Sequence, residues 1–296
     1  MPIRTPTPTE LSPAAAALVL AFAAATGTAA PSPDAWALHG QHETLRDAFA
    51  SSPFQRPLVV QSSEAASELK GEIYAIVEHP FKTTVQVLED RSRWCEVLML
   101  HQNVKRCRAG GDAPADTVAL VVGRKAQHTP EQGFRMDFKF HVAARAPDFV
   151  RVQLASPEGP LGTRDHRVTL QAAPLDAKRS FIHLSYGYSF GSVARLATQA
   201  YMVTAGRHKV GFTVTGKTDD GKPVYISGMR GMVERNAMRY FLAIEAYFGA
   251  LAVPPALRQE KRMNDWFALT EQHPRQLHEL GRDEYLALKR RDLAAM

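Results

Sequence analysis

The sequence predicts an α+β protein in which an antiparallel sheet packs against a long helix near the C-terminus, with a helical tail behind it. Three observations lead to this fold class. From residue 103 to 190 apolar and polar side chains alternate, which is typical of antiparallel strands with one face in water. Residues 229–251 form a broadly apolar helical segment that other elements must cover. The segment after Pro254 and Pro255 is polar, nearly charge-balanced and helix-prone.

The chain begins with the pattern of a secretory signal. Arg4 precedes an unbroken apolar run, Ala14–Ala25, and small residues follow up to Ala29. This run has 12 residues, whereas a membrane-spanning helix needs about 20. We therefore predict a signal peptide over residues 1–29 and a periplasmic or secreted mature protein. The alternative is an alanine-rich, disordered N-terminus.

Residues 30–56 contain several prolines and are predicted as a lead-in segment with one short helix, His42–Ala50. The main α+β domain is expected over residues 57–252. It begins with strands at 58–61 and 72–77 and continues with helices at 82–90 and 92–100.

The alternation is clearest where Phe134, Met136 and Phe138 alternate with Arg135 and Asp137. Strands are expected at 117–122, 134–142, 150–154, 168–170 and 182–190. A helix at 192–205, a hairpin around 219–221 and the apolar helix 229–251 follow. Residues 253–296 are predicted as a helical C-terminal extension.

The formal net charge of +6 is a modest excess, because acidic and basic residues are interspersed. This distribution argues against a nucleic-acid partner. A basic face would favour peripheral contact with anionic lipid head groups; the alternative is that the charge serves solubility alone.

The two cysteines, Cys95 and Cys107, lie close together in the sequence. In an oxidising compartment such a pair predicts a disulfide, which would stabilise the fold by roughly 3 kcal/mol. Two buried free thiols are the alternative.

A local pattern resembles the START-like superfamily (SRPBCC, the helix-grip fold). It runs through Ala75–Phe81, Val85–Asp90 and Trp94–Val97 as strand, proline, helix, acidic turn and tryptophan. The resemblance covers roughly residues 58–250 and implies a curved sheet wrapped around the last helix, with a cavity for a lipid or another apolar ligand between them. The chain would be an exported bacterial-type member with an atypical C-terminal extension. The segment 192–227 is inserted relative to the family, which leaves open the choice of closing helix.

The resemblance implies that the protein binds or carries a hydrophobic, lipid-like molecule without a cofactor. Aromatic and methionine side chains suit adaptable apolar pockets. Ordinary core packing is the alternative role for the side chains that we expect near such a cavity, which are Trp94, Phe138, Tyr186, Tyr188, Met232, Met238 and Phe241.

One motif indicates an enzyme. Gly187–Gly191 fits the G-x-S-x-G pattern around Ser189, whose partners would be Asp219 or Glu245 as the acid and His273 or His278 as the base. Hydrolase sheets are built from βα units, whereas the preceding strands here alternate as in a meander. We therefore predict no catalytic residue; a serine hydrolase, a cyclase-like activity in the cavity and an envelope interaction protein without a ligand are the alternatives.

Four histidines in the strand region lack the spacing of a metal site, and we expect ordinary surface or core roles for them and no metal. They are His101, His141, His166 and His183. The polar cluster Arg164–Arg167 beside Gly162 is expected to be a solvated hairpin end, with a ligand head-group site as the alternative.

Overall fold

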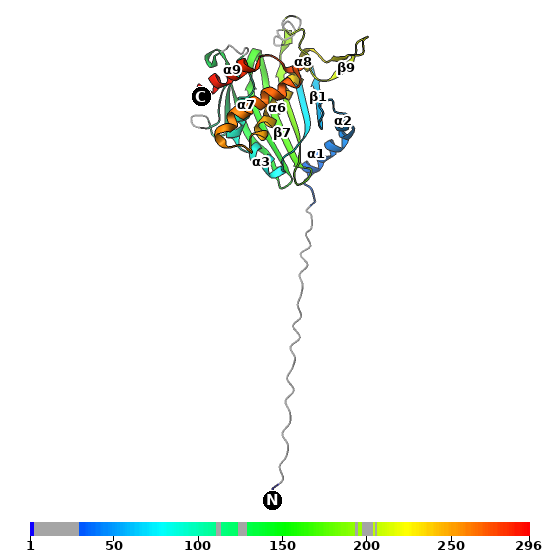
Figure 1. Ribbon diagram of the computed structural model, residues 1–296, viewed down its shortest axis with the longest axis vertical. Helices are drawn as coiled ribbons and strands as arrows, with labels where there is room; N and C mark the ends of the chain where they lie inside the picture. Colours follow the sequence, from blue (N-terminus) through cyan, green and yellow to red (C-terminus); the bar gives the residue numbers. More distant parts are fainter. Residues whose placement is uncertain (3–29, 111–113, 124–128, 193–194, 197–203, 205) are drawn as a thin grey trace. The chain divides into compact units, whose positions relative to one another are not determined.

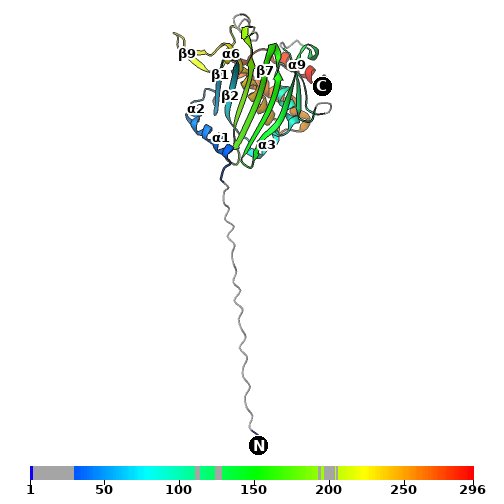
Figure 2. The ribbon, with the colours of Figure 1, turned by 180° about the vertical axis from the view of Figure 1, so that it is seen from behind.

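The computed structural model has an eight-stranded antiparallel sheet with the long helix α6 across one face (Figures 1 and 2). The strands lie in the order β1-β2-β8-β7-β6-β5-β4-β3. Their bounds are β1 Leu58–Glu64, β2 Glu68–Val77, β3 Val104–Arg108, β4 Thr117–Val122, β5 Phe134–Ala146, β6 Phe149–Glu158, β7 Thr163–Pro174 and β8 Ser180–Phe190. This arrangement confirms the predicted α+β fold class.

The structure describes residues 1–2, 30–110, 114–123, 129–192, 195–196, 204 and 206–296. Residues 31–296 belong to one unit, so the predicted lead-in segment and C-terminal extension pack together with the sheet. Nearly all of the predicted signal peptide and most of the predicted helix at 192–205 lie outside the described residues. No helix in the described part is long and apolar enough to cross a membrane.

The helices come before β1, between β2 and β3, and after β8 along the chain. Their bounds are α1 Pro33–Thr44, α2 Arg46–Ala50, α3 Phe81–Leu88, α4 Arg91–Leu98, α6 Gly228–Gly249, α7 Pro255–Glu271, α8 Pro274–Leu277 and α9 Arg282–Ala294. Single turns, η1 Pro130–Gln132 and η2 Pro160–Gly162, precede β5 and β7.

Helix α6 packs against β1, β2 and β8 of the sheet, as expected for a closing helix; the alternative closing helix at 192–205 lies mostly outside the described residues. At the closest approach of α6 a Cβ added to Gly71 of β2 would lie 2.9 Å from the Val233 carbonyl oxygen and 3.3 Å from Cβ of Ala237. A glycine at this position lets strand and helix backbones touch. The interior is therefore filled where α6 crosses β2.

The two faces of the sheet bury different residues. Ile182 and Leu184 of β8 belong to the main core with α6, whereas Phe181 packs with Leu38 of α1 in a second core on the opposite face. The expectation of one fully wet face is therefore wrong at this end of the sheet. The expected helix at 42–50 also begins too late, because Ser32 caps α1 and a proline occupies its first turn.

The C-terminal extension is helical as predicted, but its inner side is buried. Trp266 of α7 and Tyr285 of α9 are 2% and 1% exposed. The Tyr285 hydroxyl donates to the Leu100 carbonyl at 2.8 Å, and Lys289 Nζ donates to the Val104 carbonyl at 2.6 Å. Although the tail is polar in composition, the side that carries Trp266 and Tyr285 is therefore part of the interior.

The predicted hairpin around 219–221 is confirmed as β9 Val214–Lys217 and β10 Pro223–Tyr225. The fully buried carboxylate of Glu234 in α6 holds the two residues immediately before β9. It accepts hydrogen bonds from Ser62 Oγ at 2.6 Å, from the Phe212 backbone N–H at 2.6 Å, and from the Thr213 N–H and hydroxyl at 2.9 and 2.7 Å.

The predicted disulfide between Cys95 and Cys107 is present, with the two Cα atoms 5.3 Å apart. It joins α4 to β3. Helix α9 contacts residues 99–103, the loop between α4 and β3. The disulfide and α9 therefore hold this loop from two sides.

Candidate functional site

A buried histidine of β7, His166, lies beside a β-bulge. Arg164 pairs with Ser189 and Arg167 with Gly187, so two residues of β7 lie opposite one residue of β8. Asp165 in the bulge has a φ of 52°. His166 lies on the same face of β7 as Val168 and Leu170, 4% exposed, with its ring stacked on Tyr188 at 5.0 Å. The expectation of a solvated hairpin end is therefore wrong for His166.

The loop before β7 fixes the His166 ring. The Thr163 hydroxyl donates to the Pro160 carbonyl at 2.7 Å and lies 2.8 Å from His166 Nε2, so we assign Nε2–H as the donor to Thr163. A Cβ at Gly159 would lie 2.0 Å from this nitrogen, so only glycine leaves room for the ring. Burial lowers the pKa of His166 to about 4, and it is neutral at pH 7.

Five rings follow one another between the inner face of the sheet and α6, and we call them the aromatic row: His166, Tyr188, Tyr186, Tyr240 and His101. The centroid distance is 5.9 Å from Tyr188 to Tyr186, 5.3 Å from Tyr186 to Tyr240, and 5.4 Å from Tyr240 to His101. The row thus runs from the β7 bulge across β8 to α6 and on to the loop after α4.

Burial keeps the three phenols of the row protonated. It raises the pKa of Tyr240 to about 12 and also raises the pKa values of Tyr186 and Tyr188. Tyr240 is partly buried, and its ring contacts Tyr186 of β8 and His101 in the loop after α4. Neutral hydroxyl and imidazole groups of this kind orient a ligand in an otherwise apolar site.

The structure separates the other expected cavity residues. Phe138 lies on the inner face of β5 and is 6% exposed, and Met232 of α6 is half-buried. Met238 and Phe241 are fully buried, with the Arg56 guanidinium 5.0 Å from the Phe241 ring. Tyr186 and Tyr188 are therefore the two expected residues that the row brings together.

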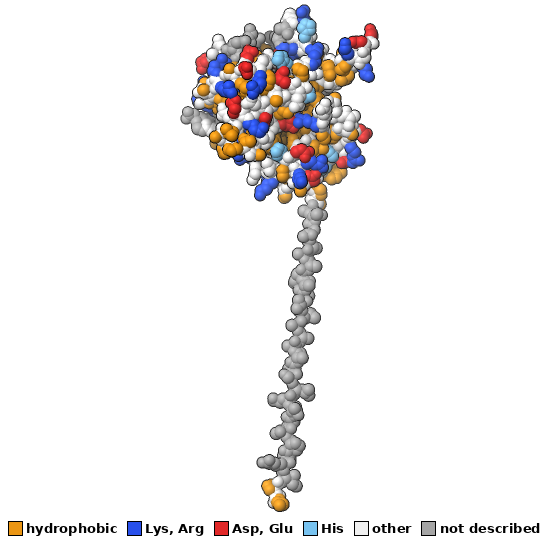
Figure 3. Space-filling model, viewed as in Figure 1, with side chains coloured by type: hydrophobic (Ala, Val, Ile, Leu, Met, Phe, Trp, Pro, Cys, Tyr) orange, Lys and Arg blue, Asp and Glu red, His pale blue; other side chains and the backbone are white. Residues whose placement is uncertain are grey.

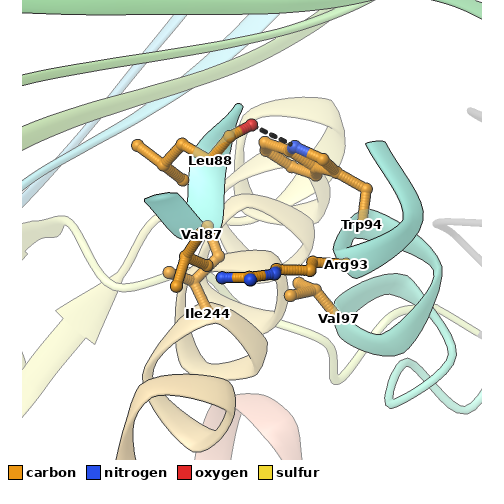
Figure 4. A pocket seen from close by; sticks show the side chains of 6 residues that line it. All are labelled: Val87, Leu88, Arg93, Trp94, Val97 and Ile244. Atoms are coloured by element: carbon orange, nitrogen blue, oxygen red, sulfur yellow. Dashed lines mark hydrogen bonds between the residues drawn. The ribbon is translucent and has the colours of Figure 1, made fainter. Parts of the chain in front are cut away.

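Trp94 lies elsewhere, in a small pocket between α3, α4 and α6 (Figure 4). Its ring N–H donates to the Leu88 carbonyl at 2.9 Å. The pocket encloses about 210 Å³ including its open side, and its other lining residues are Val87, Leu88, Arg93, Val97 and Ile244. The enclosed space amounts to about 10 Å³, which is room for at most one water molecule, so we assign it no ligand.

The sequence did not identify three residues of the aromatic row as site residues. His101 and His166 were expected to have ordinary roles, and Tyr240 was not singled out. Helical spacing offers a signal for Tyr240, because it lies three residues after Ala237 on the side of α6 that contacts the sheet. The two-residue period of β7 offers a signal for His166, because it lies two residues before Val168 and four before Leu170.

The arrangement expected for a serine hydrolase does not form. Ser189 lies within β8 rather than on a strained turn. The His273 ring packs against two phenylalanine rings, His278 Nδ1 lies 3.0 Å from a glutamate, and Glu245 pairs with an arginine at 2.5 Å. Asp219 lies in the turn of the β9–β10 hairpin. Three of the four candidate partners of Ser189 are thus engaged with other residues, and the fourth lies in the hairpin turn.

The other two histidines that were expected to have ordinary roles, His141 and His183, lie on the opposite face of the sheet. His183 stacks on Tyr74 at 4.3 Å, and its Nε2 lies 2.9 Å from a carboxylate oxygen of Glu72; His141 is exposed. The described residues contain no group of three or more histidine, cysteine, aspartate or glutamate side chains that could hold a metal ion.

The neutral, buried state of His166 predicts acid sensitivity. The unfolded chain binds a proton near pH 6.5 and the folded chain near pH 4, so stability rises with pH across this window and is lost on acidification. The contribution is up to about 3 kcal/mol. Urea unfolding at pH 7 and pH 4.5 should show a smaller pH-dependent loss for His166→Gln than for the wild type. The exposed-site control His141→Gln should keep the wild-type loss, and an unchanged loss in His166→Gln would contradict the prediction.

No protein-family model matches the chain, and no curated protein sequence matches it. Similar solved structures include norcoclaurine synthase from Thalictrum flavum, with 14% identity, TM-score 0.35, and coverage of 49% of this chain and 89% of that one. A START superfamily protein from Mycobacterium smegmatis has 11% identity, TM-score 0.32, and coverage of 48% and 93%. Human StAR-related lipid transfer protein 5 has 10% identity, TM-score 0.31, and coverage of 57% and 88%.

Proposed function

We propose that the protein binds a hydrophobic, lipid-like small molecule between the inner face of the sheet and α6, along the aromatic row. The succession of three protonated phenols and two imidazoles in this interior is the observation that carries the proposal. Burying polar groups is costly, and an apolar core would avoid that cost. Aromatic walls with a few polar groups are typical of ligand sites.

The ligand would lie on the Tyr240 side of α6. On the β2 side the contact between Gly71 and Ala237 leaves no space, whereas Tyr240 retains accessible surface next to Tyr186. Apolar burial would supply the affinity, at about 25 cal/mol per Å² of ligand surface.

We also propose that the protein acts after export. The N-terminal pattern of Arg4 and Ala14–Ala25 supports this location, and so does the Cys95–Cys107 disulfide, because disulfides persist in oxidising compartments. The basic excess would favour peripheral contact with anionic membrane surfaces, from which a lipid-like ligand is taken up or to which it is delivered.

Two neighbouring residues of β7 allow a matched test. Val168 pairs with Tyr186 and is buried on the inner face, whereas Thr169 points to the opposite face. The wild type should bind the neutral dye Nile red with an increase in fluorescence. Val168→Trp should fill the site and abolish this binding, and Thr169→Trp should leave it unchanged.

Thermal unfolding of the same variants separates binding from packing. If the protein has open space for a ligand, the added ring occupies that space and the free energy of unfolding changes little. If the region is a tightly packed core, the added ring lowers the free energy of unfolding by roughly 1–3 kcal/mol. Absence of dye binding by the wild type, together with strong destabilisation of Val168→Trp, would show that the aromatic row is ordinary core.

A further inference from the structure

Positive charge is in excess where α6 meets the C-terminal extension. Arg235 and Arg239 of α6 and Lys209 all contact the carboxylate of Glu279, with Lys209 Nζ at 2.9 Å and Arg239 at 3.1 Å. Among these four groups, one negative charge faces three positive charges. The side chains of Arg235 and Arg239 are 6% and 5% exposed, so water screens their charge weakly.

Arg239 also keeps an unused donor. Its Nε–H is buried and has no hydrogen-bond partner within the described part of the chain. Burial lowers the pKa of Arg239 to about 10, which leaves it charged at neutral pH. A buried donor without a partner is uncommon in folded proteins and calls for a physical explanation.

The field of this cluster reaches the end of the aromatic row. Burial lowers the pKa of His101 first, and the charges of Arg239, Lys289, Lys105 and Arg235 lower it further. Nδ1 of His101 accepts the Asn103 backbone N–H at 3.1 Å, so we assign the proton to Nε2. His101 and Tyr240 therefore each offer one donor in a region of positive potential.

We infer that the ligand of the proposed site carries a carboxylate, which lies at His101 and Tyr240 while its apolar body follows Tyr186 and Tyr188. Two donors match the two oxygens of a carboxylate, and hydrogen bonds to an ionised acceptor are stronger than those to a neutral one. The uncompensated charge of Arg235 and Arg239 would favour the same group. This inference rests on the proposed function.

Displacement of Nile red from the full-length protein tests the inference. Palmitate should displace the dye at a concentration at least about tenfold lower than methyl palmitate, because the ester has lost its charge. Tyr240→Phe should reduce this preference severalfold by weakening palmitate alone. Tyr74→Phe, on the opposite face of the sheet, should leave the preference unchanged.

Four other results would each contradict part of this inference or the proposed function. Equal displacement by palmitate and its methyl ester overturns the carboxylate while dye binding still supports the proposed function. Equal weakening of both compounds in Tyr240→Phe removes Tyr240 from head-group recognition and overturns the placement. Stronger displacement by hexadecyl phosphate than by palmitate also overturns the carboxylate assignment. Failure of the wild type to bind dye, palmitate and ester alike contradicts the proposed function itself.

Discussion

A protein that ends at Leu280 and so lacks α9 is expected to be unfolded. Helix α9 buries Tyr285, Leu286 and Leu288, each 5% exposed or less. Burial of a large apolar side chain stabilises by about 1.5–3 kcal/mol, so the loss of three approaches the whole stability of a typical domain, about 5–15 kcal/mol. The carbonyls of Leu100 and Val104 would also lose their donors.

Circular dichroism and the yield of soluble protein measure this effect. A protein that ends at Ala294 and lacks only the exposed Ala295 and Met296 should match the full-length chain in both. If the chain that ends at Leu280 showed a cooperative thermal transition near that of the full-length protein, the extension would be dispensable for folding.

Glu234→Ala is expected to destabilise the protein by about 3–5 kcal/mol. The substitution leaves two backbone N–H groups and two hydroxyls without their buried acceptor, and each unsatisfied buried donor costs about 1–3 kcal/mol. Urea unfolding measures the loss. The surface variant Glu284→Ala should change stability by less than about 0.5 kcal/mol.

Protease cleavage within residues 214–225 provides a second measurement for Glu234→Ala. Glu234 holds the backbone N–H groups of Phe212 and Thr213, immediately before β9, so cleavage of the hairpin should accelerate in the variant before the domain unfolds. A loss of stability below about 1 kcal/mol would show that water replaces the carboxylate at this position.

The sequence predicted the elements whose signal is local. The strand at 117–122 has the predicted bounds, because Thr117 is followed there by an unbroken short run of apolar, mostly β-branched residues. The pair Cys95 and Cys107 needed only its own spacing and the expectation of an oxidising compartment. The apolar helix was also recognised, since apolar residues predominate between 229 and 251.

The parts that the sequence did not predict depend on distant contacts. The stacking of the His166 ring on Tyr188 depends on the pairing of β7 with β8 and on the space at Gly159, which no pattern along one strand records. Met238 and Phe241 were expected beside a cavity because α6 is apolar on most sides. The extension covers α6 on one side and the sheet covers it on another, so apolar character alone does not tell which side meets a ligand.

The contacts between α9 and the segment after α4 also determine when the protein can fold. The contacts from Tyr285 to Leu100 and from Lys289 to Val104 each join residues 185 positions apart. Contacts of this length slow folding, because a long loop must close before they form. If the chain is exported as we propose, its last residues must be synthesised before the domain is stable, and it would stay open long enough to pass unfolded through a secretion channel.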